Sequence, residues 1–254
     1  MTHVASTAGT QPLPRRERQR QQTVTEITAT AHRLLLRDGV VGVTLRSIAR
    51  EMGMTAPGLY RYFDSHEAVV TALAAQLYDD VRDALCEARD AQPPDDVTAR
   101  LIEVCRAFRS WALGHRAEFG LLFANPITDP ARPATDVCEE AGRRFGLVFG
   151  DLFTQLWQQR PFPVPAQDDL DGDLVAQLRS EQDLVTGDVP IGAVYVFLRC
   201  WARLYGTVTL EVFGHLGWAL DDTSAIFEDM LTDNAAALGA LDDYHRLRTP
   251  RPPG

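Results

Sequence analysis

The sequence contains no lysine, no Cys-x-x-Cys pair and no uninterrupted apolar run of about 18 residues. Without such a run we expect no membrane-spanning helix, and the small, polar residues 1–14 lack the apolar segment of a secretory signal. The four cysteines are scattered without metal-ligand spacing. This favours buried, reduced thiols in a cytoplasmic protein that needs neither a metal nor a cofactor.

Three signatures of enzymes are also missing: a Gly-rich phosphate loop, a nucleophile elbow and an HExxH zinc motif. We therefore expect a protein that is not an enzyme. Strict apolar–polar alternation, which would indicate strands, is absent, and so are internal repeats. The predicted fold class is all-α.

The net charge of −10 is unevenly distributed along the chain. Residues 1–65 carry nine arginines and five acidic residues, a net charge of +4, whereas residues 66–254 carry sixteen arginines and thirty acidic residues. A small basic head on a large acidic body lets one end approach phosphate while the rest repels it. The acidic total therefore does not exclude DNA binding.

Near the N-terminus, apolar residues recur at three- and four-residue steps over residues 18–37, which predicts an amphipathic helix that stops at Asp38-Gly39. A disordered leader, residues 1–14, and a basic arm, Arg15 to Arg20, precede it.

The next segment has the signals of two short helices joined by a sharp turn. Thr44 can cap a helix over residues 45–52, and Gly53 stands where a left-handed backbone would end it. Thr55 can cap a third helix, with Pro57 in its first turn.

This pattern predicts a helix-turn-helix, in which Ala49 permits a close crossing and apolar side chains fix the angle between the helices. The alternative is a plain helical hairpin inside a core. The exposed face of the second helix would enter a major groove, and the helix starts at Thr44 and His66 would attract phosphate. The candidate DNA-binding residues are Thr44, Arg46, Thr55, Ala56, Pro57, Gly58, Tyr60, Tyr62 and His66.

The string from Thr44 to Phe63, with its continuation to Val70, resembles the TetR/AcrR family of bacterial repressors. The resemblance implies that Thr44, Thr55, Tyr60 and Tyr62 touch DNA, mostly its backbone. It also implies a phosphate contact at position 66, where a lysine is usual in the family. Because His66 brings no full charge at pH 7, we expect a weaker contact there.

Downstream, Ser65 can cap a fourth helix. The Pro-, Asp- and Gln-rich segment 161–188 is expected to be a mobile excursion with a short helix near 170–178. The other predicted helices of the body span residues 66–89, 96–113, 118–123, 134–160, 190–216 and 223–241.

Two stretches of the body, from Phe108 to Phe123 and from Arg199 to His215, resemble a C-terminal class of the same family. The resemblance implies a homodimer built by the last two long helices, although an interior helix of a monomer is the alternative. The candidate dimer-interface residues are Phe197, Leu204, Val208, Phe227 and Leu231.

Aromatic side chains of the body could line a cavity for a small organic effector, apolar or aromatic, or could form simple core. The candidate ligand-binding residues are Phe108, Trp111, Phe119, Phe123, Phe149, Phe153, Tyr195 and Trp201, with Trp157 as a further possible lining residue. Glu211 and His215 lie four residues apart on a helix, but without a third ligand a hydrogen-bonding or capping role is favoured over a metal site.

These observations predict a leader and arm at 1–20, a three-helix helix-turn-helix domain at 21–66, a ligand-binding and dimerisation domain at 67–246 and a flexible tail at 247–254. The predicted function is a repressor that binds a palindromic operator in double-stranded DNA as a dimer, in the cytoplasm and at the nucleoid, and is released by its effector. The alternatives are a helical small-molecule binder or enzyme with a structural helix-turn-helix, and an activator with the same head.

Overall fold

In the computed structural model, which describes residues 14–124, 137–185 and 189–248, every regular element is helical. The all-α prediction is therefore confirmed for these residues. Within them, no helix is long and apolar enough to cross a membrane. The chain divides into two units, Met1–Leu73 and Ala74–Gly254.

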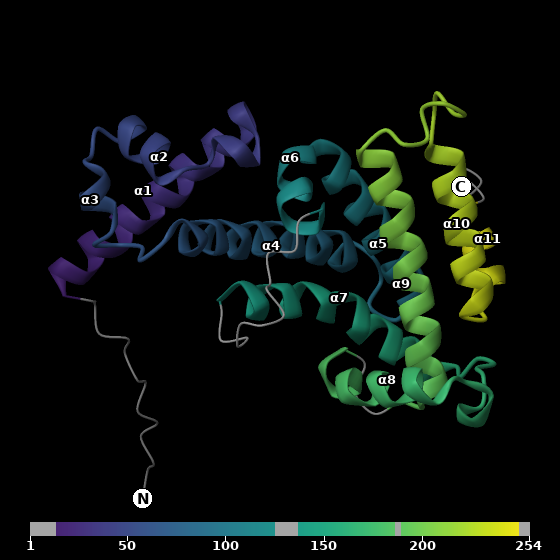
Figure 1. The fold of residues 1–254 in the computed structure, drawn as a ribbon. Coiled ribbons are helices and arrows are strands. Elements are labelled where there is room, and N and C mark those ends of the chain that lie inside the picture. Colours follow the sequence, from purple (N-terminus) through teal and green to yellow (C-terminus); the bar gives the residue numbers. More distant parts are fainter. Residues whose placement is uncertain (1–13, 125–136, 186–188, 249–254) are drawn as a thin grey trace, which may run out of the picture. The chain divides into compact units, whose positions relative to one another are not determined.

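The first unit contains α1 (Arg15–Asp38), η1 (Val40–Gly42), α2 (Leu45–Glu51) and α3 (Ala56–Leu59), and α4 (His66–Asp90) begins in it (Figure 1). Its core is formed where α2 packs on α1 and α3. The residues of this core that are fully buried include Ile27, Leu34, Leu35, Ile48 and Leu59.

Helix α1 begins three residues earlier than the apolar pattern predicts, so the expected basic arm, Arg15 to Arg20, is its first part. The arm has no apolar face, which is why periodicity missed it. Arginine, glutamine and glutamate are nonetheless good helix formers, and Pro14 stands at the N-cap, just before the first helical turn. Its arginines therefore have a fixed place on a helix.

Helix α4 begins and ends close to the predicted residues. The Ser65 hydroxyl accepts a hydrogen bond from the backbone N–H of Ala68 at 3.1 Å, so the predicted N-cap is confirmed. The helix runs without a break to Asp90, and its residues Val69, Leu73, Leu77 and Val81 are buried.

The second unit is a bundle in which α5 packs against α7 and α9, α10 lies beside α9, and α8 crosses the ends of α7 and α9 (Figure 1). Asp96 caps α5 by accepting the backbone N–H of Ala99 at 2.9 Å. The elements of this unit after α4 are α5 (Val97–Gly114), α6 (Arg116–Phe119), the π-helical turn η2 (Gly120–Ala124), α7 (Val137–Gln159), η3 (Gln167–Asp169), α8 (Gly172–Val185), α9 (Ile191–Val212), α10 (Ser224–Ala237) and α11 (Leu241–Arg248).

Two parts of the second unit differ from the sequence prediction. The segment expected to be an excursion contains α8, which has 14 residues and extends beyond the predicted 170–178. The last predicted helix, 223–241, ends at Ala237, because Gly239 has a φ of 61° and reverses the chain into a separate helix, α11. The leader before Pro14, the start of the helix predicted at 134 and the tail after Arg248 lie outside the described residues.

The left-handed turn at Gly53 provides a stability test. Gly53 has a φ of 65°, so Gly53→Ala is expected to destabilise the protein by about 1–2 kcal/mol through backbone strain alone, since no atom crowds the added Cβ. Gly146, inside α7, also has free space around a Cβ, and Gly146→Ala is expected to stabilise the helix by about 1 kcal/mol. Urea unfolding followed by circular dichroism measures both; changes of the same sign would contradict this interpretation of the turn.

Candidate nucleic-acid interface and ligand cavity

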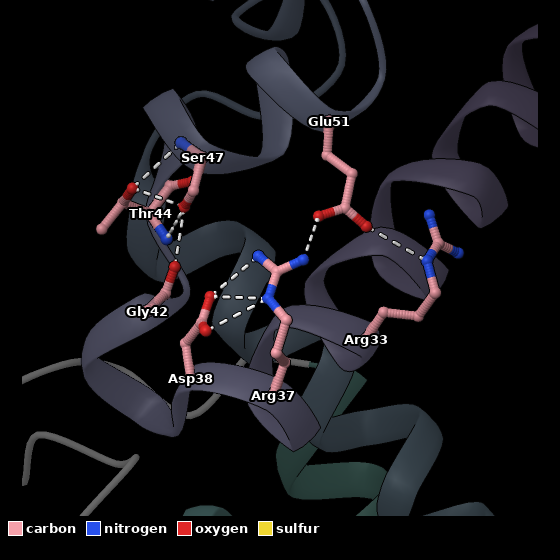
Figure 2. Close-up of polar contacts among 7 residues, drawn as sticks. All are labelled: Arg33, Arg37, Asp38, Gly42, Thr44, Ser47 and Glu51. Atoms are coloured by element: carbon pink, nitrogen blue, oxygen red, sulfur yellow. Dashed lines mark hydrogen bonds and ion pairs between the residues drawn. The ribbon is translucent and has the colours of Figure 1, made fainter.

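Helix α2 is fixed at its start by a reciprocal cap (Figure 2). The Thr44 hydroxyl accepts the backbone N–H of Ser47 at 3.1 Å, and the Ser47 hydroxyl accepts the backbone N–H of Thr44 at 3.1 Å. The Ser47 hydroxyl also donates to the carbonyl of Gly42 at 2.7 Å. The predicted cap at Thr44 is thus confirmed, and it ties α2 to η1.

The end of α2 is held on α1 by a carboxylate between two guanidinium groups (Figure 2). Glu51 lies 3.3 Å from Arg33 and 3.2 Å from Arg37, and Arg37 also pairs with Asp38 at 2.8 Å. The hydrogen bond from Arg37 lowers the pKa of the Asp38 carboxyl, against a smaller effect of burial. Two of the nine arginines of the basic head are therefore engaged inside it.

Between the two helices, the backbone N–H of Met54 donates to the carbonyl of Ala49 at 2.9 Å, directly after the turn at Gly53. The turn takes the predicted left-handed conformation, and Ala49 is buried at the crossing. Both observations confirm the helix-turn-helix geometry predicted from these residues.

Helix α3 has four residues, and its start is closed differently from the predicted Thr55 cap. Thr55 occupies the N-cap, but its hydroxyl makes no capping bond; its carbonyl accepts the backbone N–H of Gly58 at 2.8 Å instead. The prediction of a side-chain cap at Thr55 was wrong, because this one-turn helix is closed by the backbone. The chain continues in a turn, where the N–H of Tyr62 donates to the carbonyl of Leu59 at 2.8 Å.

Six of the nine candidate DNA-binding residues are exposed, and the other three are half-buried. Gly58, Tyr62 and His66 are half-buried. The remaining candidates are exposed: Thr44, Arg46, Thr55, Ala56, Pro57 and Tyr60.

Arg20, which was not among the candidates, holds the end of the α3 turn. Its guanidinium donates to the carbonyl of Arg61 at 2.8 Å and lies 5.7 Å from the centre of the Tyr62 ring. The two partners are 41 residues apart in sequence, so no local pattern could have found the contact. Tyr62 is therefore positioned by α1, whereas Tyr60 is 54% exposed.

His66 has an internal partner. One ring nitrogen, Nε2, lies 2.5 Å from the carbonyl of Val43, which can only accept a hydrogen bond, so this nitrogen carries the donated proton. The other ring nitrogen, Nδ1, lies 4.0 Å from the carboxylate of Glu67. The imidazole thus ties the start of α4 to the link before α2, and only its remaining edge is left for the phosphate contact expected from the sequence.

In the second unit, an apolar cavity of about 60 Å³ lies among α5, α7, α9 and α10. Three of the candidate ligand-binding residues line it, namely Phe149, Phe153 and Trp201. The other lining residues are Thr98, Leu101, Ile102, Cys105, Leu156, Phe197, Cys200, Leu204, Leu231, Asn234, Ala235, Leu238 and Ala240.

The remaining candidate ligand-binding residues lie outside this lining. Phe108, Phe119 and Phe123 form an aromatic cluster with ring centres 4.8–6.1 Å apart. Trp111 stacks on His115, and Tyr195 lies under the guanidinium of Arg199. Trp157, the further possible lining residue, packs edge-on against Phe162. These side chains fill the core or its margin, as the alternative of simple core expected.

Most of the candidate dimer-interface residues are buried within the single chain. Val208 and Phe227 are at most 1% exposed, and Leu204, Leu231 and Phe197 line the cavity. The regularly spaced apolar residues of α9 and α10 are therefore buried, as their spacing predicts. The side chains that cover them, however, belong to the same chain. A partner would have to contact other positions of these helices.

Arg109 forms a bidentate ion pair with Glu211, and the hydroxyl of Thr223 donates a hydrogen bond to the same carboxylate. Only 4% of the Glu211 side chain is exposed. His215 is exposed beyond the end of α9. The favoured hydrogen-bonding role is confirmed for Glu211, and no group of acidic, His or Cys side chains in the described residues could hold a metal ion.

Comparisons with known families match both units. Residues 27–73 match the family described as "Bacterial regulatory proteins, tetR family", and residues 101–234 match "Tetracyclin repressor-like, C-terminal domain". The chain belongs to the TetR family of transcriptional regulators.

Individual relatives agree with this assignment. The HTH-type transcriptional regulators Rv1816 of Mycobacterium tuberculosis and Mb1846 of Mycobacterium bovis are each 29% identical over 230 residues, which cover 87% of this chain and 89% of theirs. Among solved structures, the regulatory protein SCO4313 has a TM-score of 0.66 at 28% identity, over 88% of this chain and all of that one. A protein from Rhodococcus sp. RHA1, at 23% identity and a TM-score of 0.54, shares the fold over 88% of this chain and 93% of its own.

Two variants separate the effect of the Arg20 contacts on DNA binding from the effect of its charge. Arg20→Gln and Arg16→Gln each remove one positive charge from α1, so each is expected to lower the salt slope of DNA binding by about one. Arg20→Gln alone releases the carbonyl of Arg61 and the ring of Tyr62, and is expected to weaken binding about fivefold further. Fluorescence anisotropy on duplex DNA measures both effects. Equal losses in the two variants would show that Arg20 acts only through its charge.

Proposed function

We propose that this TetR-family regulator is a dimeric repressor that binds a palindromic operator and is released by a small apolar effector. The observation that carries the proposal is the first unit itself. A capped α2 and a sharp left-handed turn support an exposed face made by Thr55, Ala56, Pro57 and Tyr60, within residues 1–65, the part of the chain with net positive charge. Such a face fits a major groove, and the surrounding arginines fit phosphate.

Within that face, Ala56 and Pro57 are suited to a thymine methyl, and the hydroxyls of Thr55 and Tyr60 to phosphate or base edges. Arg46 lies in the first turn of α2, close to its capped N-terminus. The N–H groups of that turn and the helix dipole favour a phosphate oxygen at the same place. We assign backbone positioning to Thr44, Arg46 and Tyr62, and base contacts to the start of α3.

For dimerisation we propose the outer faces of α9 and α10. The exposed apolar side chains there are Leu198, Leu210, Phe213 and Ile226, each about 40% exposed. A two-fold dimer would present two recognition helices about 34–36 Å apart, one turn of B-DNA. This separation is what makes a palindromic operator the expected target.

Release requires that a ligand in the cavity favour a different separation of the two heads. We propose α4 as the connecting element, since it is one helix from His66 to Asp90. Tyr78 on α4 contacts the rings of Phe123 and Phe145, with centres 5.7 and 5.8 Å apart. Phe145 in turn contacts Phe149 and Trp201, which line the cavity. A continuous series of packed rings therefore connects the cavity lining to α4.

The DNA contact is tested by a double variant. Tyr60→Ala/Tyr62→Ala is expected to lose the salt-dependent retention on DNA that we expect of the native protein, because it removes the exposed ring and hydroxyl of Tyr60 and those of the half-buried Tyr62. Footprinting on the promoter region of the protein's own gene, at low salt, is the measurement. Tyr195→Ala in α9 serves as a control that should bind like the native protein. Absence of a native footprint under these conditions would refute the proposal.

A further inference from the structure

A second hollow adjoins the apolar cavity. It has a volume of about 390 Å³ and lies where α5 begins, α7 ends and α11 packs; we call it the polar cleft. Thr98 and Leu156 line both the cavity and the polar cleft, so the two hollows adjoin at these side chains. The residues that line the polar cleft are Asp95, Asp96, Val97, Thr98, Leu156, Gln159, Arg160, Asp243 and Arg246.

The cavity offers nothing to a charged group. Its lining is hydrocarbon apart from Thr98, Asn234, the indole of Trp201 and two thiols, and burial raises the pKa of Cys105 to about 12 and that of Cys200 to about 11, so both thiols are neutral. The Asn234 amide donates to the carbonyl of Cys200 at 3.1 Å and to the sulfur of Met230 at 3.3 Å. An ion placed there would lose its hydration without gaining a partner.

The polar cleft, in contrast, has an excess of negative charge. Its two guanidinium groups, of Arg160 and Arg246, are both engaged by Asp243, at 2.8 and 2.9 Å. One carboxylate oxygen of Asp96 caps α5, which leaves the second oxygen available to a ligand. Asp95 is exposed and forms no ion pair with any residue that the structure describes. The three carboxylates of the polar cleft outnumber its two guanidinium groups by one, and among the described residues Asp95 and Asp96 form no ion pair.

We propose that the effector is a cationic amphiphile, with its apolar body in the cavity and its ammonium or amidinium group in the polar cleft beside Asp95 and Asp96. This assignment rests on the proposed ligand response. The apolar part is matched to a lining of Phe149, Phe153 and Trp201 and to a volume with room for several methylene groups. An anionic amphiphile would have to share the two arginines with Asp243 and would face the carboxylates of Asp95 and Asp96.

Helix α11 links the two hollows. Its preceding residue, Ala240, lines the cavity, and Asp243 lines the polar cleft. Tyr244, fully buried, donates a hydrogen bond to the carboxylate of Glu228 on α10 at 2.6 Å, which fixes α11 on the bundle. The part of the fold that completes the polar cleft is thus the helix that the sequence pattern did not predict.

Three probes with one apolar chain test the proposal on the full-length protein: octyltrimethylammonium, octanol and octanoate, below their micelle concentrations. Calorimetry, with Trp fluorescence as a second signal, gives their affinities. We expect the cation to bind about tenfold tighter than the anion, with the alcohol between them, because one carboxylate at about 4 Å contributes about a fivefold factor in water. The preference should shrink as salt is raised.

Asp95→Asn/Asp96→Asn is expected to abolish the preference for the cation and leave octanol binding unchanged. Asparagine also caps helices, so α5 should remain folded, which a thermal melt checks. The matched control, Asp168→Asn/Asp169→Asn, makes the same charge change in η3, outside the polar cleft, and should keep the preference. Ala235→Leu, which adds three carbons to the cavity lining, should weaken all three probes alike.

Equal or tighter binding of octanoate, a preference that survives in Asp95→Asn/Asp96→Asn, or no binding of any probe would overturn the proposal. Release of bound DNA by each probe is measured separately. Cation binding that needs Asp95 and Asp96 but leaves DNA bound would support the site and count against the ligand-responsive repressor. DNA binding without any probe binding would overturn the amphiphile site and leave the DNA-binding function standing.

Discussion

The ion pair between Arg109 and Glu211 is the interaction on which the helical body most depends. The carboxylate of Glu211 is almost completely buried on α9, and a buried charge without a partner would be strongly destabilising. Arg109 comes from α5 and also reaches the hydroxyl of Ser224 and the ring of Phe227, whose centre lies 4.9 Å away. One guanidinium therefore joins three helices, α5, α9 and α10.

A second pair repeats this arrangement one turn earlier on α5. Arg106 binds Glu228 of α10 with both arms of its guanidinium, at 2.9 and 3.0 Å, and the Tyr244 hydroxyl donates to the same carboxylate. Burial by itself would raise the pKa of Glu228, but the hydrogen bonds from Arg106 and Tyr244 outweigh it and leave the pKa lowered. The stabilisation of the fold by ionised Glu228 is fully present at a pH above the ordinary pKa of a glutamate. It is lost as the pH falls through the lowered pKa of Glu228.

These two pairs explain how the bundle tolerates an apolar cavity. An empty space lined by hydrocarbon forfeits packing energy, and a loose bundle would collapse into it. Here charge-assisted hydrogen bonds join α5 to α9 and α10, three of the helices that enclose the cavity, so its walls cannot close freely. A ligand can recover the missing contacts, and we therefore propose the cavity as the place where an effector would bind.

The features that the sequence predicts correctly are those that depend on neighbours in the chain. The cap at Thr44, the turn at Gly53 and the cap at Ser65 each satisfy a local backbone requirement, so the residue type alone reveals them. The helical period of Leu204 shows that a face is buried but not what buries it, and in the single chain side chains of the same protein cover most of the predicted dimer-interface residues. Contacts such as Arg20 with Arg61, and Arg109 with Glu211, join residues 41 and 102 positions apart, which no local pattern encodes.

We propose that the basic helix-turn-helix unit, carried on an acidic body with an apolar cavity, binds DNA as a symmetric pair. Selection of binding sites from random duplex DNA with the purified full-length protein tests it most directly. The account predicts an enriched sequence with two-fold symmetry, whose half-sites are centred about one helical turn apart, roughly 10 base pairs. A single asymmetric site would contradict binding as a dimer. The absence of any enriched sequence at low salt would contradict sequence recognition by the helix-turn-helix.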